Sequence, residues 1–382
     1  MRIVSATVYA LRIPFVEAFA HSARERSFSD SVVVRVVDDA GFEGWGEGAP
    51  RPYVTGETVD FMLGHLVERL CPRLLAVEIP PLAGPEDLPS IDALIPEAPT
   101  PVVLSDGASR AALEIAVLDC ALRRADRSLG ALLPPARKKV VYSGVITAGP
   151  RDKVAEHARR MRLIGLHQIK IKVGIGDDLE RVRSVRDVLP EASLRVDANG
   201  AWTPDEAARM IEALAPFGIA AVEQPLPRGE LAPLCALRRR SPVPLMVDES
   251  LVTIADAEAL IAAGACDLFN VRISKCGGLA RSRAIARRAV AAGIQVQIGS
   301  QVGETAILSA AGRHLAASID PLAFAEGSFG ALLLSEDVSV ETVRFGHRGE
   351  ASLLRGTGLG IRVIEERLRK YAAKVVAVPS AG

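Results

Sequence analysis

Five charged residues follow one another along the chain at nearly equal intervals: Lys172, Asp197, Glu223, Asp248 and Arg272. Their separations are 25, 26, 25 and 24 residues. Each residue lies at the end of a short apolar run that is typical of a buried strand. A separation that matches one strand–helix unit, repeated four times, predicts that five charged groups meet at the same end of successive parallel strands.

Three of these residues are carboxylates, Asp197, Glu223 and Asp248. Converging carboxylates repel one another and need a cation to stay ionised. Hard oxygen ligands without neighbouring His or Cys select Mg²⁺, and Mn²⁺ is chemically suited as well. In an alternative interpretation, each carboxylate caps the following helix or pairs with an arginine, although this does not explain the regular spacing.

A lysine pair, Lys170 and Lys172, precedes Asp197 in the run KIK. Side chains two residues apart on a strand share a face, so we expect both to point inward. Two close ammonium groups in a buried setting repel one another, which favours loss of a proton and makes a lysine a usable base. Alternatively, the two lysines extend their charged ends from a strand edge to solvent.

Apolar strands alternate with amphipathic helices from residue 136 onwards, which indicates a parallel sheet. Charged groups from five successive strand ends meet only if that sheet closes, so the sequence predicts a modified (β/α)7β barrel of the α/β class. We assign the barrel to residues 136–340. The expected helices cover residues 152–163, 178–189, 204–214, 254–263 and 279–292.

The first 130 residues have a different pattern, which predicts an α+β capping domain. Alternating apolar residues at 3–13 and 31–37 indicate antiparallel strands, and a strong helix is expected at 109–125. We interpret the Gly-rich run at 41–48 as a turn and the Pro-rich stretch at 79–101 as an irregular loop. Residues 341–382 are expected to return and pack on this domain.

The chain has 382 residues, with 46 basic and 46 acidic side chains. This balance gives no reason to expect nucleic acid or a charged membrane as a partner, and no run is long enough for a membrane helix. The N-terminus lacks the features of a signal peptide. The five cysteines are an odd number without a CxxC pair, which is typical of reduced thiols in a cytoplasmic protein.

Taken together, the runs KIK, DAN, EQP and DES resemble the muconate-lactonizing subgroup of the enolase superfamily, the family of mandelate racemase and muconate lactonizing enzyme. The resemblance covers nearly the whole chain. It implies that Lys172 is the base, that Lys170 modulates it, and that Asp197, Glu223 and Asp248 hold Mg²⁺ against a small-molecule carboxylate. It also implies a homo-oligomer.

One position departs from this subgroup, in which the sixth strand usually reads N-x-K-x-x-K-x-G-G. Here Arg272 replaces the first lysine. Arginine stays protonated, so it is a poor proton shuttle between two faces of a substrate. Arg272 is then expected to steady negative charge. In an alternative interpretation Lys275 takes over the missing role, but strand alternation would point Lys275 away from the side of Arg272.

Further residues are candidates for contacts with the substrate. Asn199 would share a face with Asp197, and Glu304 follows the seventh strand. Two N-terminal loops resemble the specificity lid of the family, and Arg24 and Tyr53 are the candidates in them. The complete set of candidate substrate-binding residues is Asn199, Glu304, Lys275, Arg24 and Tyr53.

These features predict a Mg²⁺-dependent enzyme that removes a proton next to a carboxylate by one-base chemistry, as a muconate-type cycloisomerase or a syn-elimination dehydratase. A racemase or epimerase of amino acids or dipeptides is an alternative. An alternative of another class is a barrel that binds a carboxylate without catalysis.

Overall fold

Eight parallel strands form the centre of the computed structural model, which describes residues 1–21, 24–75, 77–97, 103–147 and 149–378, without the side chains of 17–21 and 24–26. The strands neighbour one another in sequence order from β5 to β12. Ser143 N, just before β5, donates to Ala325 O of β12 at 2.8 Å and joins the two edges. The strands are β5 (Gly144–Ile146), β6 (Gln168–Lys172), β7 (Ser193–Asp197), β8 (Ile219–Glu223), β9 (Leu245–Val247), β10 (Leu268–Val271), β11 (Gln295–Ile298) and β12 (Phe324–Ala325).

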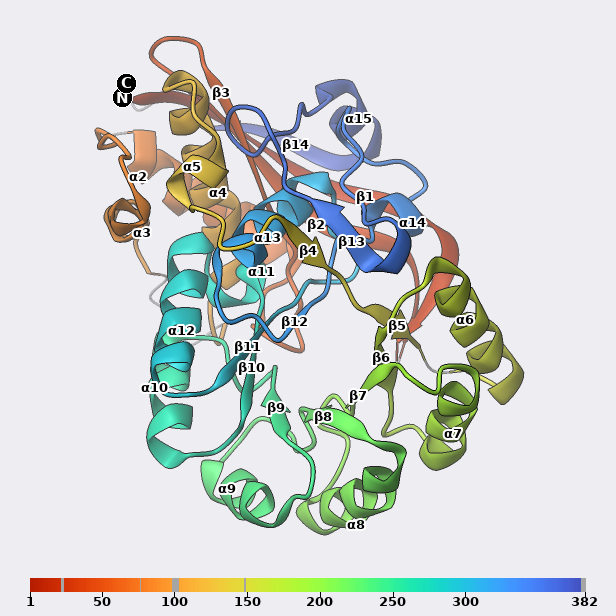
Figure 1. Cartoon of the computed structure of the whole chain (residues 1–382). Helices are drawn as coiled ribbons and strands as arrows, with labels where there is room; N and C mark the ends of the chain where they lie inside the picture. Colours follow the sequence, from red (N-terminus) through yellow and green to blue (C-terminus); the bar gives the residue numbers. More distant parts are fainter. Residues whose placement is uncertain (22–23, 76, 98–102, 148, 379–382) are drawn as a thin grey trace.

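Helices connect these strands and lie outside the ring that the strands make in Figure 1. Within the described residues, seven long helices alternate with the eight strands, so the predicted (β/α)7β barrel is confirmed. A short helix, α11 (Ile273–Cys276), is inserted directly after β10. The long helices are α6 (Arg151–Ile164), α7 (Asp178–Val188), α8 (Pro204–Leu214), α9 (Leu231–Arg240), α10 (Ile254–Ala263), α12 (Leu279–Ala291) and α13 (Ala306–Ser318).

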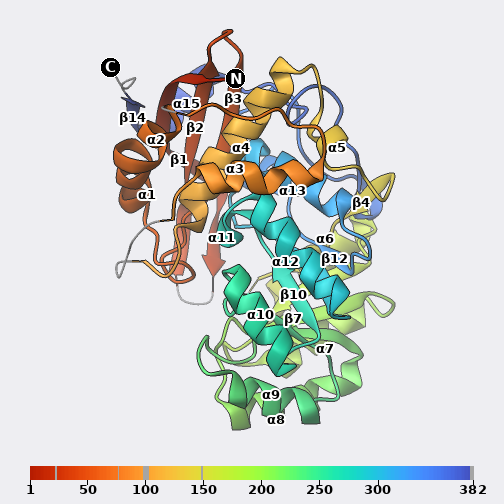
Figure 2. The same ribbon diagram turned by 90° about the vertical axis from the view of Figure 1, so that its left-hand side faces the viewer.

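An antiparallel sheet with the order β14-β1-β2-β3 lies beside the barrel (Figure 2). Its last strand comes from the C-terminus, because Ala6 in β1 pairs with Val378 in β14. A second small pair joins β4 to β13. The strands are β1 (Ile3–His21), β2 (Arg24–Asp38), β3 (Glu43–Gly48), β4 (Lys139–Val141), β13 (Glu350–Ser352) and β14 (Ala372–Val378).

The remaining helices precede the barrel strands or follow them along the chain. None of the helices in the described part of the chain is long and apolar enough to cross a membrane. Part of the Pro-rich stretch that we expected to be irregular is helical, since α3 lies within it. These helices are α1 (Val59–His65), α2 (Cys71–Leu75), α3 (Leu88–Leu94), α4 (Gly107–Arg124), α5 (Leu129–Leu132), α14 (Gly330–Leu333) and α15 (Glu365–Tyr371).

The Gly-rich run is a strand in the structure, so its interpretation as a turn was wrong for the residues of β3. Gly44, Gly46 and Gly48 alternate along β3 and face α4. A Cβ atom at these positions would lie 2.0–2.1 Å from backbone oxygen atoms of α4. The glycines therefore let the helix pack against the strand at backbone distance, which no larger residue allows.

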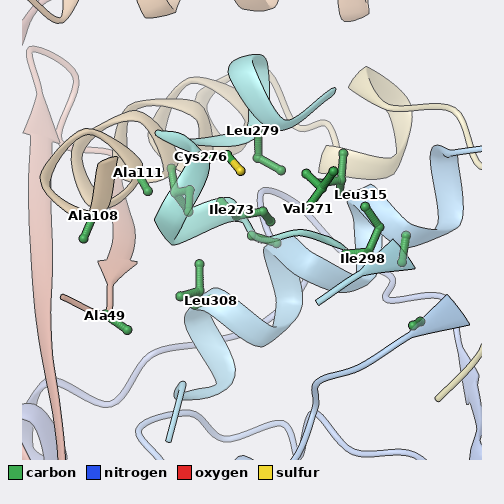
Figure 3. Close-up of a cluster of buried hydrophobic side chains, with 14 of the residues drawn as sticks. Ala49, Ala108, Ala111, Val271, Ile273, Cys276, Leu279, Ile298, Leu308 and Leu315 are labelled. Atoms are coloured by element: carbon green, nitrogen blue, oxygen red, sulfur yellow. The ribbon is translucent and has the colours of Figure 1, made fainter. Parts of the chain in front are cut away.

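Helix α4 also reaches the barrel. A buried apolar cluster joins Ala108 and Ala111 of α4 to Ile273 and Cys276 of α11, with Leu308 of α13 beside them (Figure 3). Polar contacts add to this docking. Fully buried Glu114 of α4 accepts hydrogen bonds from the first N–H groups of α12, and Glu47 of β3 accepts those at the start of α13.

Substitution of Gly46 by alanine tests the close packing of β3 on α4. The new Cβ would lie 2.0 Å from Ala112 O and 2.5 Å from Ala116 N, so the helix must move. We expect the free energy of unfolding to fall by an amount near the upper end of about 1–3 kcal/mol, measured by urea denaturation.

Gly64→Ala in α1 is the matched control, because the nearest atom to its added Cβ is a side-chain oxygen at 3.9 Å. This variant should be neutral or stabilised by about 0.5–1 kcal/mol through helix propensity. Equal stability of the two variants would contradict the close packing.

Candidate active site

The regularly spaced charged residues all lie at the carboxyl ends of consecutive barrel strands. Lys172, Asp197 and Glu223 are the last residues of β6, β7 and β8, while Asp248 and Arg272 directly follow β9 and β10. Register places Lys172 opposite Asp197 and Asp197 opposite Glu223. The barrel thus brings all five side chains to one end.

Asp197 and Glu223 share the ammonium group of Lys170. Lys170 Nζ lies 3.3 Å from Asp197 Oδ2 and 3.3 Å from Glu223 Oε2. Burial alone would raise the pKa of Asp197, but the charges of Lys172 and Lys170 hold it well below its usual range. Burial, together with the charge of Asp197, raises the pKa of Glu223 to about 7. Asp197 is therefore the more firmly ionised of the two.

Asp248 and Glu223 share the guanidinium group of Arg272. Arg272 Nη2 contacts Asp248 Oδ2 and lies 3.5 Å from Glu223 Oε1. Burial opposes ionisation of Asp248, yet the charges of Arg272 and Lys275 lower its pKa. Asp248 and Glu223 thus both contact an arginine, as the alternative interpretation expects, and the metal site stays a prediction.

Lys170 is held by carboxylates rather than destabilised by the second lysine. Its Nζ donates to Glu326 Oε2 at 2.7 Å in addition to its contacts with Asp197 and Glu223. Burial lowers the pKa of Lys170, but the charges of Glu223, Glu326 and Asp197 raise it by more, so it lies well above its ordinary value. The mutual repulsion expected of the lysine pair is thus outweighed at Lys170 by its carboxylate partners, among them Glu326, which contacts it only in the folded barrel.

Lys275 lies on the same side as Arg272, which corrects the expectation from strand alternation. The chain turns into α11 immediately after Arg272, so a period of two no longer applies. Lys275 Nζ donates to Asp248 Oδ1, to Asp248 O and to Asn270 O at 2.7–2.9 Å. These bonds use all three ammonium hydrogens, and Lys275 is only 1% exposed.

Lys172 has a different environment from the other lysines. Its Nζ donates to Asp197 Oδ2 at 2.6 Å and to Asn199 Oδ1 at 2.7 Å, and the residue keeps 8% exposure. Asn199 has a φ of 46° and donates from Nδ2 to Glu249 Oε1 at 3.0 Å. Asn199 therefore links Lys172 to Glu249 and orients the ammonium group through these two hydrogen bonds.

The donor set at this end of the barrel fits a magnesium ion in its chemistry. Asp197, Glu223 and Asp248 are fully buried and offer hard carboxylate oxygens, which Mg²⁺ prefers. Lys170 and Arg272 already join them pairwise, which marks the space among them as favourable for positive charge. In the described part of the chain, no three acidic, His or Cys side chains stand as a ready-made metal cluster. A bound ion would therefore have to displace protein cations.

The other predicted substrate-binding residues lie at different depths. Glu304 is 8% exposed and accepts a hydrogen bond from Gln301 N, while Tyr53 is 59% exposed. Arg24 belongs to β2 by its backbone, but its side chain lies outside the described residues. Arg51, two residues before Tyr53, is buried and donates hydrogen bonds to three backbone carbonyl groups, so it holds neighbouring segments together.

Three polar residues of the barrel interior were not among the predicted site residues. Asn270 Nδ2 donates to Glu223 Oε1 at 2.7 Å, and Arg195 Nη2 donates to Glu326 Oε1 at 2.9 Å. Asn270 and Arg195 each precede a strand-end charge by two residues, so the period of a strand would have placed them on the inner face. Glu326 directly follows β12 and obeys the same strand-end rule.

Comparison with known proteins gives the same picture as the geometry. Residues 153–367 match the family described as "Enolase C-terminal domain-like". The chain is 31% identical over 368 residues to a hydrophobic dipeptide epimerase of Enterococcus faecalis, covering 94% of this chain and 99% of that one. It is 30% identical to muconate cycloisomerase 1 of Rhodococcus opacus, covering 97% and 98% of the two chains.

Solved structures agree over the whole length. An N-succinyl Arg/Lys racemase from Bacillus cereus superimposes with a TM-score of 0.89 at 26% identity, covering 99% of this chain and 100% of that one. A dipeptide epimerase from Cytophaga hutchinsonii, complexed with Mg and D-Ala-L-Val, gives 0.88 at 26% identity with the same coverage. These relatives are enzymes, which favours catalysis over a barrel that only binds a carboxylate. This chain therefore belongs to the enolase superfamily and is one of its enzymes.

Proposed function

We propose that this enzyme removes the proton next to a substrate carboxylate with Lys172, in a Mg²⁺-dependent reaction on one face of the substrate. The observation that carries the proposal is the contrast among the four cations at this end of the barrel. Lys170 and Lys275 are surrounded by oxygen atoms, and Arg272 is ion-paired. Lys172 bonds Asp197 and Asn199 and keeps one ammonium hydrogen beyond these two bonds.

The metal site would consist of Asp197, Glu223 and Asp248. Mg²⁺ bound there supplies positive charge for the substrate carboxylate and for the negative charge that develops as the proton leaves. Mn²⁺ prefers the same oxygen ligands and is expected to substitute. The chain itself orients Lys172 through Asn199 and holds Lys170 as a fixed positive charge behind it.

Arg272 and Lys275 argue against a second acid/base group opposite Lys172. A guanidinium does not give up its proton in proteins, and Lys275 uses its three hydrogens in bonds to Asp248 and Asn270. An inverting proton transfer needs a group on each face of the substrate. The geometry thus supports one-base chemistry, either a cycloisomerisation of the muconate type or a syn-elimination of water.

A racemase or epimerase is the second candidate, because two similar relatives carry such activities in their names, on hydrophobic dipeptides and on N-succinyl-Arg/Lys. This candidate requires a group other than Arg272 on the second face. The two candidates differ in their products, since the first gives a rearranged or dehydrated acid and the second gives the opposite stereoisomer.

Glu304 is proposed to bind a polar or anionic group of the substrate. Burial, partly offset by the hydrogen bond from Gln301 N, raises the pKa of Glu304 to about 8. The carboxyl group is then protonated near neutral pH and can donate a hydrogen bond. Tyr53 and Arg24 are proposed to contact the distal end of the substrate from the lid.

The cysteines bear on the cellular compartment of the enzyme. All five cysteines are free thiols and four of them are buried, which suits a reducing compartment such as the cytoplasm. The homo-oligomer stays a prediction from the family resemblance.

Exchange of the substrate α-proton with D₂O tests the role of Lys172. We expect the wild type, with Mg²⁺, to catalyse exchange or conversion of at least one acid from a panel of muconates, hydroxy acids, dipeptides and N-succinyl amino acids. Lys172→Ala should reduce the rate by about 10²–10⁴-fold, the usual contribution of a general base. Exchange would be followed by NMR.

Lys153→Ala, at an exposed position of α6, is the control and should retain the wild-type rate. Exchange that persists in Lys172→Ala would assign the proton transfer to another group, and an inverted product would favour the epimerase.

The pH dependence of unfolding tests the protonation of Glu304. The pKa of Glu304 is raised in the folded protein, so the stability that its proton contributes is complete below the unfolded value of about 4.3 and is lost as pH rises through about 8. In Glu304→Gln the neutral amide keeps the acceptor for Gln301 N. We expect the free energy of unfolding of the wild type to fall relative to this variant between about pH 5 and about pH 9. Parallel profiles in urea denaturation would show that Glu304 is ionised in the folded protein.

A further inference from the structure

We propose that the guanidinium group of Arg272 competes with the divalent cation for Glu223 and Asp248, so that metal binding releases Arg272 as a binding group for an anionic part of the substrate. This inference rests on the proposed function, because it takes Asp197, Glu223 and Asp248 as the metal ligands. It goes further by assigning a coupling between metal and substrate to one residue of this chain.

The same oxygen atoms are involved in both interactions. Arg272 Nη2 contacts Asp248 Oδ2 and lies 3.5 Å from Glu223 Oε1, between two carboxylates that are both fully buried. A cation that takes these oxygens as ligands would lie next to a guanidinium that cannot lose its charge. Repulsion between like charges is strong at such distances inside a protein, so both cannot occupy the space together.

The charge of the cluster favours this competition, because the protein's own basic groups already balance its carboxylates. Four basic groups lie within ion-pair distance of the three carboxylates. Arg195, Glu326 and the buried Glu249, whose charge acts on Arg272, bring the cluster to five basic and five acidic groups. A divalent ion would leave a large uncompensated positive charge in a buried site unless one basic group moves away. The four basic groups are Lys170, Lys172, Arg272 and Lys275.

Among the four basic groups, Arg272 has the weakest hydrogen bonds outside the three carboxylates. Lys275 donates to two backbone carbonyls as well as to Asp248, and Lys170 keeps Glu326 as a partner. Apart from the two carboxylates, Arg272 has one long hydrogen bond, from Nη1 to Gln301 Oε1 at 3.4 Å, and its Nε has no partner among the described residues.

Gln301 marks the direction of release. Its backbone N–H bonds Glu304, and Glu304 and Gln301 both follow β11 near the end of the barrel where the substrate would enter. A guanidinium that moves there presents a planar pair of donors, which matches a carboxylate. Metal and an anionic substrate would then bind cooperatively, since the ion frees the group that the substrate needs.

Mn²⁺ binding to Arg272→Ala, measured by electron paramagnetic resonance, tests the competition. Removal of the competing group should tighten Mn²⁺ binding at least about tenfold relative to the wild type, a modest factor for removing one close ion pair. Millimolar guanidinium chloride, far below denaturing concentrations, should enter the space left in Arg272→Ala and weaken Mn²⁺ binding again. An equal concentration of sodium chloride should have a smaller effect, because it only screens charge.

Arg281→Ala is the control, because Arg281 is likewise an ion-paired arginine, although less buried, and binds Asp92 and Glu97 away from this site. Its Mn²⁺ affinity should equal that of the wild type, with or without guanidinium. Thermal unfolding of each variant establishes that it is folded. For the wild type, NMR of ¹⁵N-labelled arginine side chains should show one guanidinium signal, absent in Arg272→Lys, that shifts as Mg²⁺ is added.

The outcomes separate this inference from the proposed function. Equal Mn²⁺ affinity of the wild type and Arg272→Ala, with no effect of guanidinium, would leave the metal site intact and overturn the competition. Absence of Mn²⁺ binding in both proteins would overturn the metal site and the competition together. Tighter binding in Arg272→Ala that guanidinium reverses supports the competition.

Discussion

The balance of buried charge at the carboxyl ends of the barrel strands governs the site. An ionised carboxylate taken out of water costs several kcal/mol unless partners compensate it. Here Asp197, Glu223 and Asp248 are fully buried, and each lies within ion-pair distance of two basic groups. Positive charge is therefore part of the folded site, and any catalytic cation must replace some of it.

The same balance divides the basic residues by task. Lys170 and Lys275 are enclosed by oxygen atoms, while Lys172 is oriented by Asn199 and keeps one ammonium hydrogen beyond its two bonds. Arg272 stands between these roles, because its charge is permanent but its surroundings are sparse. A site with one lysine that keeps an unused ammonium hydrogen and one permanently charged arginine suits the proton transfer that we propose, on a single face of an anionic substrate.

The capping sheet helps to fix this arrangement. Ala49, just beyond β3, donates from its N–H to Ser274 Oγ at 2.9 Å, and Ser274 lies between Arg272 and Lys275 in the sequence. A Cβ at Gly107, the first residue of α4, would lie 2.4 Å from Lys275 O, so the helix start packs directly on this segment. Both ends of the contact between β3 and α4 therefore touch the α11 segment that carries Lys275. Substitutions that disturb the capping domain are therefore expected to displace α11 and, with it, the residues of the site.

Strand-end residues could be predicted because a period of two and a strand–helix repeat fix their direction, and this gave the barrel and the five central charges. The side to which Lys275 points could not be predicted. The chain leaves the strand at Arg272, and a one-turn helix gives no periodic signal in the sequence. The state of Lys170 depends on Glu326, which is 156 residues away in sequence and meets it only when the barrel closes. Gly44, Gly46 and Gly48 suggested a turn because glycine marks both turns and close backbone contacts, and only the partner helix distinguishes them.

A crystal structure of the wild type with Mn²⁺, located by its anomalous scattering, tests the central claim most directly. The account predicts one strong peak ligated by Asp197, Glu223 and Asp248, with the guanidinium of Arg272 no longer in contact with Asp248. A peak elsewhere, or a peak at these carboxylates with Arg272 still bound to Asp248, would contradict it.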